Sequence, residues 1–385
     1  MIHIGYVLTG VVTTLLGPML PVLQSRWSLD DAQAGYLFTA QFVGAIAASG
    51  AASALIARIG SLRSLVAGYA LMCVGVTALG VSPWAVGVAS VFCFGLGLGI
   101  TITTTNLFVS ELNPTRRAAA LNIVNFTWCI GAVASAPVIG LLAEKNLTTL
   151  GLFCLSSLLI LLALWLVQFH SLNVADKPRR LEVETKASAF RSPFVLLIGS
   201  LIFLYVGTEN AVAGWVATYA SRLKGSSEYL WWLPPSIFWA MLLIGRLTAP
   251  LVLRRVAEER LALAGLATAL CGTALLTAIN TMAGMFAAVA LAGIGFASIY
   301  PITVAILPRC FGNQTTRVAG LIFMLAGLGG ATLPWAVGFI STRSDSLRAG
   351  LLVPLLGNLA MIALQVVIII ALGRLTKPTT KSAQR

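Results

Sequence analysis

Long apolar stretches, separated by short polar or proline- and glycine-rich breaks, run along the whole chain. Each stretch is long enough to cross the hydrocarbon core of a bilayer as an α-helix, and none has the alternating pattern of a membrane β-strand. The pattern therefore predicts an all-α membrane protein with twelve transmembrane helices. Their expected limits are residues 4–23, 32–56, 64–82, 85–110, 118–142, 148–169, 194–221, 229–252, 261–279, 282–307, 315–340 and 349–372.

Positively charged residues indicate the orientation of these helices. If the N-terminus is cytoplasmic, most of the 25 lysines and arginines fall in cytoplasmic segments. The outer segments then hold only Arg26, Lys145, Arg222, Lys224, Arg343 and Arg348, while Arg246 lies within a span. This asymmetry follows the positive-inside rule, so we expect a multi-pass protein of a bacterial-type inner membrane with both termini in the cytoplasm. The net charge of +13 then reflects topology and not nucleic-acid binding.

A hydrophilic segment, residues 171–193, divides the chain into an N-terminal half (1–170) and a C-terminal half (194–385) with six spans each. The halves resemble one another at a nearly constant offset of 197 or 198 positions. Examples are Arg58 and Arg255, Gly95 and Gly293, and Pro137 and Pro334. Two parallel repeats related by an axis along the membrane normal are typical of transporters whose binding site lies between the halves.

The whole chain resembles the major facilitator superfamily. The resemblance rests on the Gly17-Pro18-Met19-Leu20-Pro21 segment of the first span and on a loop motif after the second span, at Ser53, Ala57, Arg58, Gly60 and Arg63. Ala57 stands where the family usually has aspartate, which weakens the expected charge lock of this loop. The resemblance implies two six-helix halves, alternating access and no enzymatic activity, cofactor or metal.

Residues Glu209 to Tyr219, with Asn210 and Trp215 among them, are similar to the seventh helix of fucose- and glucose-permease-like sugar carriers. Glu209 falls in the middle of a span, where a charged side chain costs roughly 2.5–3.5 kcal/mol on insertion scales and usually serves a function. We therefore expect Glu209 to couple proton movement to transport, to contact substrate, or both. The alternative is a structural carboxylate that pairs with a neighbouring helix.

Other polar side chains at membrane depth are few. Gln41, Asn106, Asn122, Asn125, Trp128, Asn210, Trp215 and Tyr300 join Glu209 as candidate substrate-binding residues. Amides match the hydroxyl groups of a sugar because they offer both donors and acceptors, and tryptophan can cover an apolar sugar face. The alternative for each amide is a hydrogen bond between helices.

Four charged residues are candidates for gating: Arg58, Glu111, Arg116 and Arg246. Arg246 lies nearer the cytoplasmic end of its span than Glu209 does, by roughly 10 Å at 1.5 Å per residue. A structural role near the cytoplasmic gate is therefore favoured over a direct pair with Glu209.

These features predict a secondary active transporter for a small neutral polyhydroxylated solute, a sugar above all, with proton symport and a monomeric state in the lipid bilayer. The main alternative is an exporter (antiporter) of amphipathic compounds. A membrane receptor with an inactive transporter fold is a third hypothesis, against which the polar residues at membrane depth argue. The chain shows no enzyme motif, and its six cysteines lack the spacing of a metal site.

Overall fold

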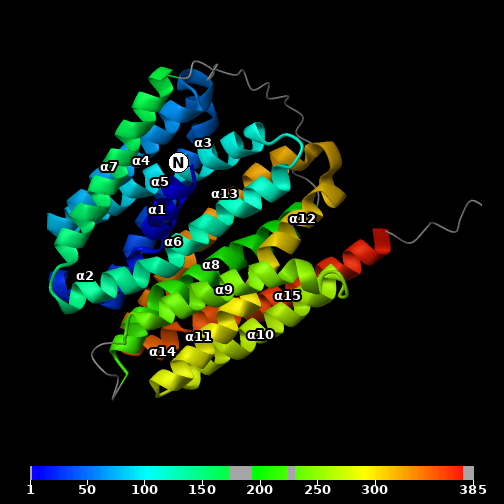
Figure 1. The fold of residues 1–385 in the computed structure, drawn as a ribbon. Coiled ribbons are helices and arrows are strands. Elements are labelled where there is room, and N and C mark those ends of the chain that lie inside the picture. The colour runs from blue at the N-terminus through cyan, green and yellow to red at the C-terminus, as the bar shows by residue number, and fades with distance from the viewer. Residues whose placement is uncertain (1, 173–192, 224–229, 376–385) are drawn as a thin grey trace, which may run out of the picture.

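The computed structural model describes residues 2–172, 193–223 and 230–375, which form helices joined by short turns (Figure 1). The expected linker, residues 171–193, lies almost entirely outside the described residues. Helices α1–α7 precede it and are called the first half below. Helices α8–α15 follow it and are called the second half.

The helices match the predicted spans closely. The first half contains α1 (Ile2–Thr14), α2 (Leu16–Trp27), α3 (Asp31–Ile59), α4 (Ser61–Val81), α5 (Trp84–Leu112), α6 (Arg117–Glu144) and α7 (Thr148–Leu172). The second half contains α8 (Pro193–Ser221), α9 (Leu233–Val252), α10 (Glu258–Ala278), α11 (Met282–Phe296), α12 (Ile299–Phe311), α13 (Thr315–Ser344), α14 (Leu347–Gly350) and α15 (Leu352–Leu375). Within the described residues, 11 helical segments are long and apolar enough to cross a membrane, or 12 if the bent pair α1–α2 counts as one span. The predicted all-α membrane fold is confirmed.

Three of the predicted spans are broken shortly before a proline. A proline has no N–H for the carbonyl four residues earlier, which weakens a helix at that point. The break between α1 and α2, with a bend of 44°, precedes Pro18. The α11–α12 break precedes Pro301, and the α14–α15 break precedes Pro354. Each break thus lies within one turn before a proline.

Glycine contacts show the internal repeat in three dimensions. A Cβ atom on Gly95 of α5 would overlap the carbonyl oxygen of Gln41 on α3, and one on Gly293 of α11 would overlap that of Phe238 on α9. The two contacts are equivalent, because 293 minus 95 is 198 and 238 minus 41 is 197. Both halves therefore use the same close helix approach, which small residues permit in membrane bundles.

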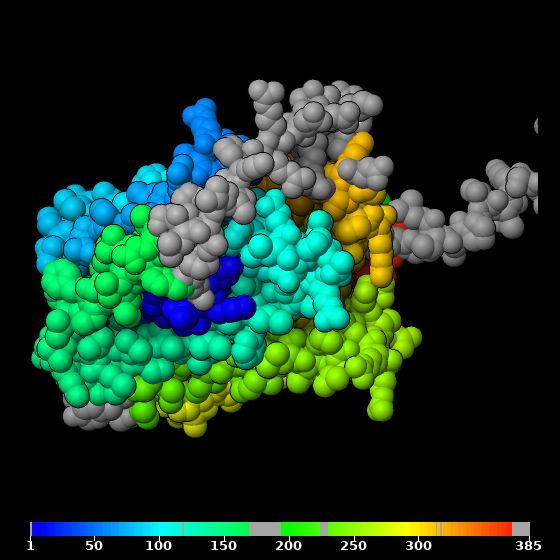
Figure 2. Space-filling view, turned by 45° about the horizontal axis from the view of Figure 1, so that its top comes forward, coloured from blue at the N-terminus to red at the C-terminus, as the bar shows by residue number. Residues whose placement is uncertain are grey.

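Among the described residues, the halves pack against each other mainly through three helix pairs: α3 with α13, α6 with α9, and α2 with α8. Figure 2 shows α6, in cyan, beside the yellow-green α9 along one face of the molecule. The end of the bundle that holds the α2–α3 turn is called the Asp31 end below. The opposite end, where α5 is followed by α6, is called the Glu111 end.

Candidate functional site

Glu209 is the centre of a buried polar cluster between the helices of the second half. Its side chain is only 7% exposed, and its Oε1 atom accepts a hydrogen bond of 2.8 Å from the hydroxyl of Tyr205, one turn earlier on α8. The Tyr205 ring lies edge-on against Phe296 at 6.0 Å and tilted against Tyr300 at 5.9 Å between ring centroids. Tyr300, a predicted site residue, therefore belongs to this cluster.

Arg246 reaches the same cluster from α9. Its Nη2 atom lies 3.7 Å from Oε1 of Glu209, and its Nη1 atom lies 3.7 Å from the sulfur of Cys129 on α6 of the first half. Its Nε atom is buried without a hydrogen-bond partner in the described part of the chain. The two groups therefore form the ion pair that the sequence favoured less than a structural role near the cytoplasmic gate. The depth of the Arg246 backbone does not give the depth of its charge, because a long arginine side chain carries the guanidinium well away from its Cα.

A central pocket lies beside this cluster, where the two halves meet. It is lined by Thr13, Thr14, Leu16, Gly17, Phe38, Gln41, Phe42, Asn210, Ala213, Gly214 and Trp239. The break between α1 and α2 thus forms one wall and α8 forms another. The pocket has room for hardly more than a water molecule. It therefore represents a narrow state of the space between the halves.

Two of the predicted site residues, Gln41 and Asn210, line this pocket. Gln41 donates its amide to the carbonyl oxygen of Thr13 at 2.9 Å, while its Oε1 atom is buried without a hydrogen-bond partner among the described residues. The Asn210 amide donates to the Val206 carbonyl at 2.8 Å. An unsatisfied buried oxygen is costly, so Gln41 can gain from a donor group on a ligand.

Trp128 of α6 borders the pocket wall. Its ring lies edge-on against Trp239, with 5.5 Å between ring centroids, and its indole N–H points to the hydroxyl of Thr13 at 3.4 Å. Asn122 and Asn125 are exposed. They share a face of α6 with Cys129, because residues three to four apart along a helix lie on one side. Of this face, Cys129 is the residue that contacts Arg246.

Two residues predicted to contact substrate donate hydrogen bonds to neighbouring helices. Trp215 is fully buried and donates its indole N–H to the carbonyl of Pro334 at 2.8 Å. Asn106 donates to the hydroxyl of Tyr6 at 3.2 Å, beside a small cluster that contains Val109 and Val124. Both side chains thus make the interhelical hydrogen bonds that were the alternative to a substrate contact, and their assignment as substrate-binding residues stays a prediction. A span position alone does not say which way a polar side chain points.

The predicted gating residues fall into two groups. Arg58, Glu111 and Arg116 are exposed at the Glu111 end of the first half. Arg246 lies apart from them, in the cluster around Glu209. The first three thus lie at one end of the bundle, where their gating role stays a prediction, whereas Arg246 belongs to the interior of the bundle.

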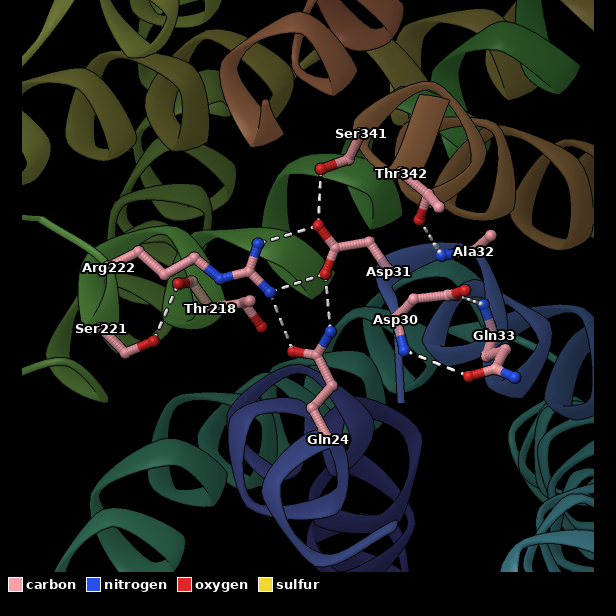
Figure 3. Close-up of polar contacts among 10 residues, drawn as sticks. All are labelled: Gln24, Asp30, Asp31, Ala32, Gln33, Thr218, Ser221, Arg222, Ser341 and Thr342. Carbon is pink, nitrogen blue, oxygen red and sulfur yellow. Dashed lines mark hydrogen bonds and ion pairs between the residues drawn. The ribbon is translucent and has the colours of Figure 1, made fainter. Parts of the chain in front are cut away.

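A charged network at the Asp31 end was not predicted from the sequence. Arg222, directly after α8, donates two hydrogen bonds to the carboxylate of Asp31, at 2.8 and 2.6 Å (Figure 3). Gln24 donates to Asp31 at 2.6 Å, and Ser341 of α13 donates at 2.5 Å. We call these four residues the Asp31 network. It joins the halves through residues 191 and 310 positions apart, which no spacing along the chain reveals.

Further contacts close the Asp31 end. The backbone N–H of Ala32 donates to the hydroxyl of Thr342 at 2.8 Å, and Thr39 donates to the carbonyl of Ala331 at 2.7 Å. A Cβ atom on Gly338 would overlap the carbonyl oxygen of Asp31. Bonds between α6 and α9, such as that from Ser236 to the carbonyl of Val133, continue the closure towards the middle. The interface is thus close-packed and bonded at this end.

The family model of the Major Facilitator Superfamily matches residues 2–334 of the chain. The chain belongs to the major facilitator superfamily. This confirms the resemblance seen in the sequence, and it confirms that the protein is a transporter and not an enzyme, since the members of the superfamily are transporters. It also establishes a multi-pass membrane protein.

The relatives of this superfamily member include sugar carriers. The glucose/mannose transporter GlcP of Bacillus subtilis is 22% identical over 353 residues, which cover 88% of this chain and 86% of GlcP. Among solved structures, the D-xylose-proton symporter superposes with a TM-score of 0.76 at 17% identity, over 94% of this chain and 95% of the symporter. The nucleoside transporter NupG superposes with a TM-score of 0.74 at 13% identity, over 98% and 100% of the two chains. The structural matches show the shared fold.

Proposed function

We propose that this superfamily member carries a small polyhydroxylated solute, a sugar, by proton symport across a bacterial inner membrane. The observation that carries the proposal is the position of Glu209. Its carboxylate lies in the middle of the bundle, one residue before Asn210, which lines the pocket between the halves. A charged carboxyl group at this depth is costly, and such groups usually serve a function. We assign proton coupling to Glu209.

The pocket chemistry supports a neutral ligand. Glu209 and Arg246 balance each other in charge, and the wall offers the amides of Gln41 and Asn210 together with Trp239. Amides pair with hydroxyl groups in both directions, and an indole ring can cover an apolar sugar face. Sugar carriers among the relatives, one of them a proton symporter, also favour uptake of a sugar over export of amphipathic compounds.

Alternating access supplies the mechanism. The N-terminal half (1–170) and the C-terminal half (194–385) rock about the pocket as two units joined by residues 171–193. The excess of basic residues in one set of loops supports a cytoplasmic position for both termini, and with that orientation the Asp31 end faces outwards. The Asp31 network then closes the outer side of the pocket. Opening it gives solute from outside access to Gln41 and Asn210, and the monomer completes the cycle alone.

Uptake of D-glucose and D-xylose into proteoliposomes tests the proposal. An inward-directed proton gradient should drive accumulation of one of the two sugars by the wild-type protein. Glu209→Gln resembles the protonated carboxyl, so this variant should still exchange labelled for unlabelled sugar but should not accumulate it. Accumulation by Glu209→Gln at the wild-type, pH-driven level would remove the coupling role. Failure of the wild type to move either sugar would reject the substrate class.

A further inference from the structure

The hydroxyl of Tyr205 and the guanidinium of Arg246 approach the same oxygen of Glu209. The distances to Oε1 are 2.8 Å from the Tyr205 hydroxyl and 3.7 Å from Nη2 of Arg246. Hydrogen bonds between arginine and carboxylate are normally about 2.7–2.9 Å long. The uncharged tyrosine therefore makes the direct bond to Glu209, while the charged arginine acts only through space. From bond strength alone, the charged arginine would be expected to make the shorter contact.

The Tyr205 side chain is fixed in place. It is 1% exposed, and its ring is held by Phe296 of α11 and Tyr300 of α12. It lies one turn before Glu209 on α8, so that the two side chains share one face of the helix. The packed ring therefore keeps the Tyr205 hydroxyl at Oε1 of Glu209.

We infer that Tyr205 is a positioning residue that holds the Glu209 carboxylate away from Arg246. The inference rests on the proposed coupling role of Glu209 and deepens it. Without Tyr205, Glu209 would close onto the guanidinium, whose Nε atom has no hydrogen-bond partner among the described residues. A bidentate pair of this kind strongly favours the charged carboxylate. With Tyr205 in place, the proton can bind to and leave the carboxylate of Glu209, and the tyrosine keeps its own proton throughout.

Other titratable groups face the cluster from three helices. Arg246 comes from α9, Cys129 from α6 and Tyr300 from α12. Each of the three interacts electrostatically with Glu209. Of the groups around Glu209, only Tyr205 has a hydrogen bond to its carboxylate among the contacts described above. Tyr205 is therefore the group to remove in a test of proton binding.

Infrared titration of the full-length protein in lipid nanodiscs measures protonation of Glu209 without any substrate. The carboxyl band of Glu209 is the one that Glu209→Gln removes. In Tyr205→Phe, which keeps the packed ring, the pH midpoint of this band should fall by at least about one pH unit as Glu209 closes onto Arg246. In Tyr205→Phe combined with Arg246→Gln, the fall should disappear, because no guanidinium remains to pair with Glu209.

Tyr219→Phe is the matched control. Tyr219 is also on α8, and its hydroxyl donates to the carbonyl of Ile279, away from Glu209. The control should leave the midpoint unchanged. A midpoint that rises in Tyr205→Phe would show a simple hydrogen-bond donor, and an unchanged one would show packing alone; either overturns the inference, as would a Glu209 that never titrates in the wild type. Failure to transport sugars would reject the proposed substrate and leave this result standing.

Discussion

Replacing Arg222 by alanine should weaken the closed Asp31 end. Asp31 would lose two charge-assisted hydrogen bonds, of 2.8 and 2.6 Å, while staying largely buried. One such bond contributes about 1.5–3 kcal/mol. The Arg222 side chain is 44% exposed, so water replaces part of the loss. We expect the substitution to destabilise the closed arrangement by about 1–2 kcal/mol. This lowers the ratio of closed to open molecules by a factor of roughly 5–30, if both side chains are solvated in the open arrangement.

Pulsed electron–electron double resonance in nanodiscs measures this shift. Spin labels at Lys145 and Ser344, which are exposed at the Asp31 end of the two halves, would be introduced after replacement of the six native cysteines. Arg222→Ala should enlarge the population with the longer distance. The control is Arg26→Ala at the same end, because Arg26 donates to the carbonyl of Leu79 within the first half. Equal distance distributions in Arg222→Ala and the control would refute the argument that the Asp31 network closes this end.

Two further substitutions test the pocket and the interface. Trp128→Ala should weaken binding of the transported sugar at least about tenfold, or about 1.4 kcal/mol, as measured by isothermal titration calorimetry; affinity within about twofold of wild type would assign Trp128 to packing. Gly338→Ala places a methyl group against the carbonyl of Asp31 and should destabilise the closed end by about 1–3 kcal/mol, seen as a longer distance between the same spin labels. Gly320→Ala on the same helix is its control, since nothing lies within 4 Å of the added atom, and equal behaviour of the two variants would contradict a close-packed α3–α13 contact.

The apolar pattern predicted the helices well because span length is set by bilayer thickness and needs no knowledge of partners. The breaks before Pro18, Pro301 and Pro354 could not be predicted from proline alone, because Pro137 and Pro334 lie inside helices that continue unbroken. The pattern merged each broken pair into one span because the apolar run continues through the break.

The site was less predictable, because side-chain direction and reach depend on neighbours far away in the chain. Gln41 and Asn210 do line the pocket, but Trp215, on the same helix as Asn210, turns to the carbonyl of Pro334, 119 positions later. The Asn106 partner, Tyr6, lies 100 positions earlier. Asp31 gave no signal, since an aspartate at the start of a helix already has a local explanation as a favourable first-turn residue.

The two segments of the first span, on either side of the joint at Leu15, pack against different halves. Its α1 segment packs mainly against α6 of its own half, whereas its α2 segment packs most against α8 of the opposite half. The pocket residues Thr13, Thr14, Leu16 and Gly17 lie directly on either side of the joint. A ligand that pulls on this wall can therefore bend the span without moving either half as a whole. The first response to a bound solute would then be a local flexing of one helix, with the larger rearrangement following it in time.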